Sequence, residues 1–174
     1  MGLPEGVRLK LNGTFGRWLY LLDEDDCLYQ EHWRIQTAVW FNEQVGKWQY
    51  VSIFPHFIKR YCSPSLNLLE YISCTSRKGE DVFRHIDDPE EILDSEDRIT
   101  RPIRQIEREA GRFSYPALLN SRYTEVYNRP LNMPVGIVHF KARFSVLYSL
   151  VIIARQLFGK KYGVLSLVNT VVNL

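Results

Sequence analysis

The first third of the chain alternates between apolar and polar residues, with the period of a half-buried strand. The alternation is clearest over 29–41, where one face carries Trp33, Ile35, Thr37, Val39 and Phe41. Shorter stretches of similar composition lie at 7–11, 14–22 and 47–53, with turn residues at 12–13, 23–26 and 42–46 between them. These stretches and turns predict a small antiparallel sheet.

Beyond Pro55 the apolar residues recur at every third or fourth position, which predicts helices. Helical segments are expected at 64–76, 80–86, 88–93, 101–111 and 142–158, and a last one ends at Val172. Ser63 and Pro64 supply the cap and the first residue of the earliest helix. Thr100 is expected to cap a helix over 101–111, which places Pro102 in its first turn. A proline farther inside a helix would cost about 3 kcal/mol. Residues 113–136 are rich in Asn, Pro, Tyr and Arg, and are expected to form an irregular connection.

The order of these elements predicts an α+β fold. A ribbon-like antiparallel sheet is expected over 1–58, and a helical domain over 59–174. Within the helical domain, 88–112 is a candidate helix-turn-helix, and 142–174 holds the apolar C-terminal helices.

The most informative stretch is 98–112, where arginines recur on one side of the predicted helix. The arginines at 101, 104, 108 and 112 lie opposite Ile99, Ile103, Ile106 and Ala110, and together with Arg98 they occupy an arc of about 120°. Arg98 belongs to the same stripe but falls in the turn before Thr100. The stripe predicts either a solvated surface helix or a DNA-recognition helix. In the second case Arg101, Arg104, Arg108 and Arg112 contact phosphates or groove edges.

The charges are distributed unevenly along the chain, although the net charge is only +2. Residues 80–97 carry nine acidic side chains and one arginine, whereas 98–143 carry nine basic and three acidic side chains. A local excess of positive charge permits a polyanion-binding surface even in a chain of modest net charge. It also permits the two segments to pair with each other or with another chain.

The sequence contains no motif typical of a nucleotide-binding or hydrolytic site. The closest approach to a cluster is His85 with Asp87 and Asp88, and carboxylates beside a histidine in a charged loop are usually solvated. Three cysteines without a paired spacing indicate a reduced, cytoplasmic protein. We therefore expect no metal, no cofactor and no catalytic residue. The longest apolar run, 144–154, is shorter than a bilayer span of about 20 residues and predicts a buried helix.

Three short stretches are similar to one family of proteins. Residues 12–17 read NGTFGR, 52–58 read SIFPHFI with Tyr61 following, and 101–104 read RPIR after Thr100. In this order, over residues 12–112, they resemble small bacterial transposase-like proteins in which a zinc ribbon precedes a helix-turn-helix. The resemblance implies a DNA-binding protein of a mobile element, with a recognition helix that starts near Arg101.

The sequence departs from that family in the ribbon. The cysteine pairs that would hold zinc are missing before Asn12 and at 41–47, so we expect a degenerate, metal-free ribbon held by packing. Aromatic side chains crowd the predicted sheet at Trp18, Tyr20, Trp33, Trp40, Trp48 and Tyr50. They are available for cross-strand packing or for stacking on nucleic-acid bases.

Three functions remain open for the chain. The leading hypothesis is a non-catalytic DNA-binding protein of transposon- or phage-related type, which contacts double-stranded DNA through its basic helix. The alternative is a protein-protein interaction module that forms a homodimer through the apolar C-terminal helices. The third is a nuclease, for which the sequence offers no recognisable set of acidic residues that would converge on two metal ions.

Overall fold

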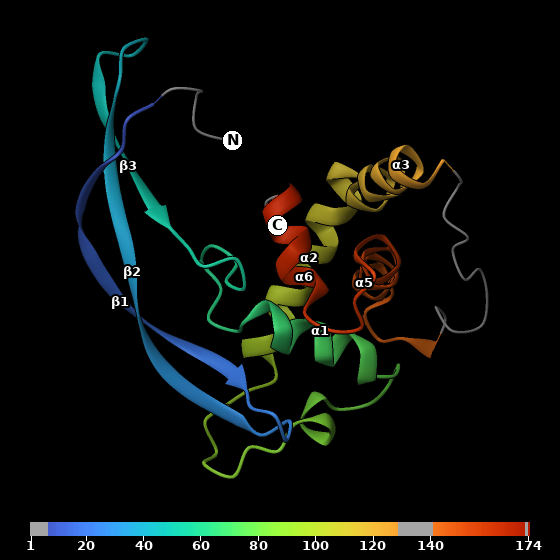
Figure 1. Ribbon diagram of the computed structural model, residues 1–174. Helices are drawn as coiled ribbons and strands as arrows, with labels where there is room; N and C mark the ends of the chain where they lie inside the picture. The colour runs from blue at the N-terminus through green and yellow to red at the C-terminus, as the bar shows by residue number, and fades with distance from the viewer. Residues whose placement is uncertain (1–6, 129–140, 173) are drawn as a thin grey trace.

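In the part of the chain that the structure describes, a three-stranded antiparallel sheet precedes five α-helices, as the sequence predicts for an α+β fold (Figure 1). The computed structural model describes residues 7–128, 141–172 and 174. The strands are β1 (Lys10–Leu22), β2 (Leu28–Asn42) and β3 (Lys47–Ile53). The helices are α1 (Leu66–Thr75), the 3-10 helix η1 (Val82–His85), α2 (Asp97–Phe113), α3 (Tyr115–Tyr127), α5 (Ser145–Phe158) and α6 (Val164–Val172).

One long strand, β1, replaces the two short strands that were expected on either side of residues 12–13. The pairing of β1 with β2 shifts register between Leu11 and Thr14, so the two intervening residues form a bulge and do not turn the chain. Gly13 has a φ of +88°, and Thr37 on β2 donates a hydrogen bond of 2.8 Å to the Asn12 carbonyl. Because β2 continues past the bulge, it holds both halves of β1 in one strand.

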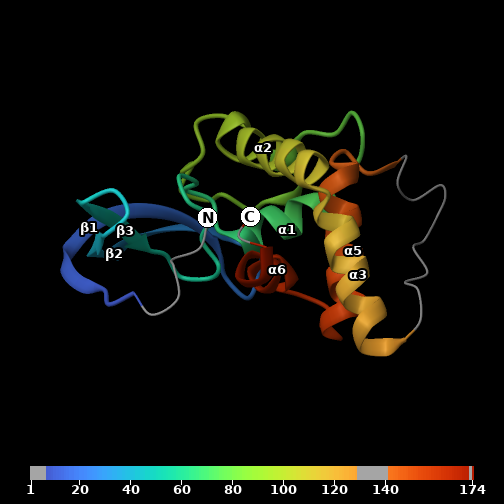
Figure 2. The same cartoon turned by 90° about the horizontal axis from the view of Figure 1, so that it is seen from above.

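The sheet meets the helices at the end of β1, and the rest of it lies to one side of them (Figures 1 and 2). The Tyr20 amide donates to the Ser63 carbonyl (3.0 Å), and the Ser65 amide donates to the Tyr20 carbonyl (2.9 Å). The amide of Leu28, at the start of β2, donates to the Asp87 carbonyl (2.7 Å). The segment 54–65 therefore connects β3 to α1 while packing against both the sheet and the helices.

The helix α1 lies at the centre of the helical part, where it packs against α2, α5, α6 and β1. Leu66, Leu69 and Ile72 form its buried stripe, as the sequence predicts. Its cap is Ser65, whose hydroxyl accepts from the Leu68 amide (3.2 Å), and not Ser63. The predicted cap was wrong, because backbone hydrogen bonds that join Ser63 and Ser65 to Tyr20 hold this stretch extended.

The segment 88–93 is not helical, contrary to expectation. The Asp88 carboxylate accepts from the amides of Ile92 and Leu93, both at 2.9 Å, and Glu91 has a φ of +49°. These side-chain bonds satisfy the backbone in a turn and compete with a helix. Only one helix, α2, lies within 88–112, so this stretch does not form the expected helix-turn-helix.

The basic helix α2 is longer at both ends than predicted. It begins at Asp97, whose amide donates to the Ser95 hydroxyl (3.1 Å), so Pro102 lies inside the helix and Thr100 is in its first turn. It continues past Gly111 and ends at Phe113, followed by Ser114, which has a left-handed φ of 54°.

The helix α3 occupies most of the region expected to be irregular. Tyr115, Leu119 and Tyr123 are buried at helical spacing, and α3 packs against α5. The predicted irregular stretch at 129–136 lies outside the described residues.

Glutamates of other helices satisfy the first amides of α5 and α6. Glu107 on α2 accepts from the amides of Val146 (3.0 Å) and Leu147 (3.2 Å), and no side chain at the start of α5 caps it. Glu70 on α1, which is 3 % exposed, accepts from the Leu165 amide (3.0 Å). A carboxylate next to the first amides of a helix interacts favourably with the positive end of the helix dipole. These two contacts fix where α5 and α6 begin.

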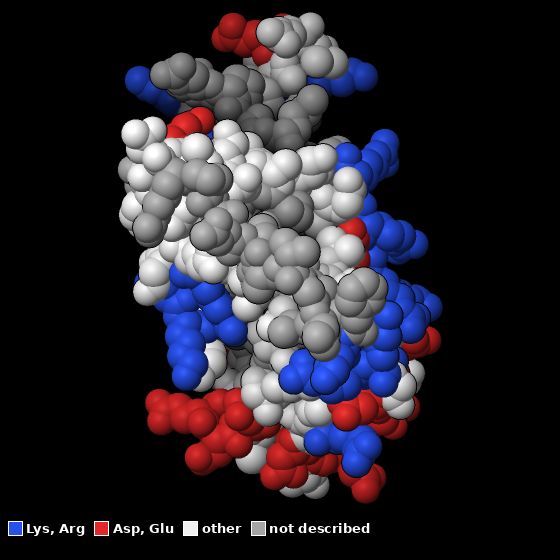
Figure 3. Space-filling model, turned by 90° about the vertical axis from the view of Figure 1, so that its right-hand side faces the viewer, with Lys and Arg blue, Asp and Glu red and all other residues white. Residues whose placement is uncertain are grey.

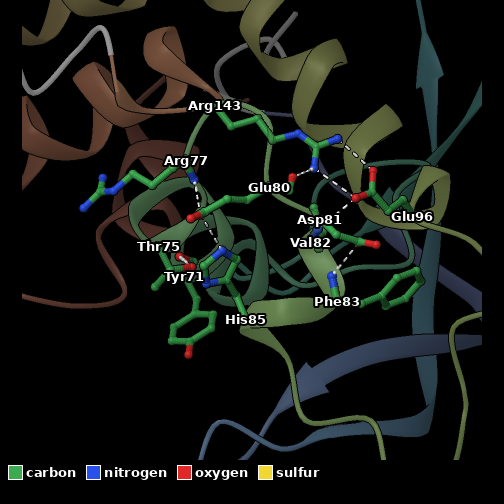
Figure 4. A network of polar contacts seen from close by, with 10 residues as sticks. All are labelled: Tyr71, Thr75, Arg77, Glu80, Asp81, Val82, Phe83, His85, Glu96 and Arg143. Atoms are coloured by element: carbon green, nitrogen blue, oxygen red, sulfur yellow. Dashed lines mark hydrogen bonds and ion pairs between the residues drawn. The ribbon is translucent and has the colours of Figure 1, made fainter.

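A third glutamate, Glu96, holds the acidic segment against the residues before α5 (Figure 4). Arg143 donates to both oxygens of Glu96 (2.9 and 2.7 Å) and to the Glu80 carbonyl (2.6 Å). Glu96 also accepts from the Val82 amide (2.8 Å) at the start of η1. The hydrogen bond from Arg143 lowers the pKa of the Glu96 carboxyl to about 2.

We expect Glu96→Gln to lower the free energy of unfolding near neutral pH by about 1–2 kcal/mol, because it replaces a charge-assisted pair that solvent partly screens. The lowered pKa means that ionised Glu96 stabilises the fold above its ordinary pKa of 4.5 and loses this effect as the pH falls toward 2. The difference between wild type and variant, measured by urea denaturation from about pH 7 to pH 3, should therefore shrink with acidity. Glu90→Gln, at an exposed position of the same segment, serves as the control. A difference that stays constant with pH would contradict this role of Glu96.

Candidate nucleic-acid interface

The helix α2 has an apolar face that is fully buried and a basic face that is exposed. Ile99, Ile103, Ile106 and Ala110 are each 0 % exposed and belong to the main core. Arg101, Arg104, Arg108 and Arg112 are all classed as exposed. The structure thus places the four predicted arginines together on the outer side of one helix. We refer to these four as the arginine face.

Arg98, at the start of the arginine stripe, is engaged by an acid of the segment that precedes α2. It lies in the first turn of α2, not in the turn before the helix, and donates to both carboxylate oxygens of Asp94 (2.9 and 2.8 Å). This contact lowers the pKa of the Asp94 carboxyl. The ion pairs among the described residues do not include Arg101, Arg104 or Arg108.

The arginine face borders an open hollow of about 790 Å³. Its lining consists of Asp97, Arg101, Arg104, Glu107 and Arg108. Glu107 is one of the two acids in this lining, and its carboxylate accepts from two amides at the start of α5. Burial raises the pKa of the Glu107 carboxyl. The Glu107 carboxylate is therefore oriented toward the start of α5.

The surface charges separate in space as they do along the sequence. On the side of the molecule in Figure 3, Lys and Arg side chains form a column along one edge, and acidic side chains gather at the lower end. Within the described residues, the acidic segment pairs with the basic region at Arg98 and at Arg143, which binds Glu96. Such pairing leaves the outward charge of Arg101, Arg104 and Arg108 available.

A second hollow, of about 410 Å³, continues from α2 toward the segment 61–64. It shares Asp97 and Arg101 with the first hollow and is also lined by Tyr61. A third, of about 380 Å³, shares Tyr61 with the second, and its lining also includes Arg17 and Arg60. The three hollows share lining residues and form one track from α2 to the sheet. Basic and aromatic side chains line it, together with the acids Asp94, Asp97 and Glu107.

Sequence reasoning missed the part of the track at Arg60 and Tyr61. The guanidinium of Arg60 lies 4.7 Å from the centre of the Tyr61 ring, and Tyr61 is 76 % exposed. The signal was the adjacent basic and aromatic pair in IKRY at 58–61. This pair gained meaning only when the fold brought it next to Arg101.

The aromatic side chains of the sheet serve packing in some places and are exposed in others. Trp33 meets Phe57 edge to face at 5.1 Å, and Phe41 meets Trp48 across β2 and β3 at 5.5 Å. Trp48 nevertheless remains 59 % exposed, and Tyr50 remains 76 % exposed. Cross-strand packing therefore accounts for only part of this aromatic surface.

The described residues contain no group of three or more His, Cys, Asp and Glu side chains placed to hold a metal ion. His85 contacts Glu80 (3.1 Å), while Asp87 accepts from the Cys27 thiol and Asp88 accepts from backbone amides. The three residues that the sequence groups together thus have separate partners. No helix in the described ranges combines the length and apolar character needed to cross a bilayer.

Comparisons of the chain with protein-family models, with curated proteins and with solved structures found no match. The resemblance to transposase-like proteins therefore rests on the short stretches at 12–17, 52–61 and 100–104. A function for the chain has to be derived from the geometry and charge of its own surface.

Proposed function

We propose that the chain binds double-stranded DNA, without catalysis, through the arginine face of α2. The observation that carries this proposal is the exposure of Arg101, Arg104 and Arg108 on a helix whose opposite face is fully buried. A buried face fixes the helix, so the outer side chains present charge in a defined arrangement. Guanidinium groups pair bidentately with phosphate oxygens or with guanine, which suits either backbone or groove contacts.

The dimensions of the arginine face suit a duplex. Arg101 and Arg112 lie eleven residues apart, which corresponds to about 16 Å along a helix axis. A major groove is about 12 Å wide, so such a face can reach phosphates on both sides of it. Binding of this kind depends steeply on salt, because each phosphate contact releases counterions.

The alternative, a homodimer formed through the C-terminal helices, finds less support. Leu147, Leu150 and Val151 on α5, and Leu165 and Val168 on α6, are each 0 % exposed because they pack in the chain's own core. The large apolar side chains of α5 and α6 exposed among the described residues include Val146 and Val171. An apolar face already covered within one chain is not available to a second copy.

A transposon- or phage-related origin is part of the proposal and rests on the motif resemblance described above. A cytoplasmic location stays a prediction. The nuclease reading requires divalent-metal-dependent cleavage of DNA, which the binding experiments below would reveal if magnesium were added.

We expect Arg104→Ala with Arg108→Ala to weaken duplex binding and to reduce the slope of log affinity against log salt by about 2, close to one unit per phosphate contact. Fluorescence anisotropy of a labelled duplex, titrated at several salt concentrations, measures both effects. Arg34→Ala with Arg84→Ala removes the same charge from exposed positions on the sheet and on η1 and is the matched control. Equal slopes for the two double variants would overturn the assignment to α2.

We expect Glu107→Gln to strengthen duplex binding about twofold to fivefold, because it removes a negative charge from the arginine-lined hollow. The glutamine carbonyl can still accept from the start of α5, so the melting temperature should change little. Glu107→Ala should gain affinity in the same direction but lose about 1 kcal/mol of stability with the cap. Unchanged affinity in both variants would show that DNA does not approach this hollow.

A further inference from the structure

Tyr61 is held in a strained and exposed position. It is the third residue of a turn closed by the hydrogen bond from the Cys62 amide to the Lys59 carbonyl (3.1 Å), and its φ is +66°. Glycine or asparagine usually occupies such a conformation, and a bulky residue there costs about 1–2 kcal/mol. Strained residues cluster at functional sites, so a tyrosine kept here calls for a role beyond packing.

The turn around Tyr61 is anchored on both sides. Lys59, only 5 % exposed, forms a 2.6 Å ion pair with Glu109 on α2. Ile58 is 1 % exposed, Cys62 is 2 % exposed, and the Asn169 side chain donates to the Ile58 carbonyl (3.2 Å). The exposed ring thus extends from a fixed turn beside α2.

Arg60 and Tyr61 together form a stacking platform with positive charge. The Arg60 guanidinium lies 4.7 Å from the ring centre, within the range of a cation–π contact. Tyr61 as a whole remains 76 % exposed even with this contact. Proteins that hold single-stranded nucleic acid combine an exposed aromatic ring with nearby basic groups in this way.

The platform adjoins the arginine face. Tyr61 and Arg101 line the same hollow, and Tyr61 also lines the next hollow with Arg17 and Phe15. A strand whose phosphates contact Arg101 would therefore meet Tyr61 next. Bases inside a duplex have both faces covered by their neighbours, so stacking on this ring requires an unpaired base or the terminal base of a duplex.

We propose that the Arg60–Tyr61 platform stacks an unpaired base, so that α2 and this turn together bind DNA where a duplex continues into a single strand. The binding of the duplex part by α2 rests on the proposed function. The DNA that the whole track fits is a junction of duplex and single strand.

The test compares three labelled DNAs by fluorescence anisotropy: a blunt duplex, the same duplex with a short thymidine extension, and one with an abasic extension of equal length. Both strand polarities are tried. We expect the thymidine extension to tighten binding by about fivefold or more, and the abasic one, which adds only phosphates, to tighten it less. Tyr61→Gly, which removes the ring and also relieves the positive φ, should lose the difference between the two extensions. Tyr61→Phe should keep it.

The matched control is Tyr50→Ala, because Tyr50 is a tyrosine of equal exposure on β3, outside the linings of the three hollows. This variant should retain the preference for thymidine. Equal gains from the thymidine and abasic extensions in the wild type would overturn the stacking site, while salt-dependent binding of the blunt duplex would leave the proposed function intact. Failure to bind the blunt duplex or the abasic extension, with tight binding of the thymidine extension, would overturn the duplex proposal and retain the platform.

Discussion

Carboxylates that accept hydrogen bonds from the first amides of another element determine how the helices are placed. Glu70, Glu96 and Glu107 each make such a contact, to α6, η1 and α5 respectively. A helix that begins inside a packed structure leaves several amides without partners, and a buried donor without a partner is costly. When a side chain of another element supplies the acceptor, the position of that element determines where the helix begins. The acids in this chain therefore act over long sequence separations.

The same principle explains why a helix with acidic residues can present a basic face. Glu107 and Glu109 lie among the arginines of α2 in sequence, yet one caps α5 and the other pairs with Lys59. Each acid is thereby oriented toward the protein, whereas Arg104 and Arg108 beside them are exposed. The distribution of partners, more than the net charge of the segment, determines the field above α2.

Much of the fold could be predicted from local periodicity. The alternation over 29–41 and the three-to-four spacing of apolar residues in α1, α2 and α5 correspond to observed elements, because burial of one face determines both. The bulge at 12–13, the turn at 88–93 and the helical α3 could not be predicted in this way. Each depends on a partner distant in sequence, or on a side chain that bonds the backbone, as Asp88 does.

The residues of the candidate site also fall into those that local periodicity predicts and those that it does not. Arg101, Arg104, Arg108 and Arg112 were predicted because a single helix carries them, and their exposure follows from the burial of its other face. The engagement of Arg98 by Asp94 and the approach of Tyr61 to α2 required the folded chain. Residues that become neighbours only when the chain folds have no characteristic spacing in the sequence.

The bulge at 12–13 separates the far end of the hairpin from the part of β1 that meets the helices. From Thr14 to Leu22 the register is fixed by β2, whereas Lys10 and Leu11 pair in a shifted register beyond the bulge. The turn at 43–46 lies farther still from the helices (Figure 1). An insertion or deletion at the tip of the hairpin should therefore leave the pairing at Tyr20 unchanged. The tip also offers a place to attach a fluorescent reporter without disturbing α2.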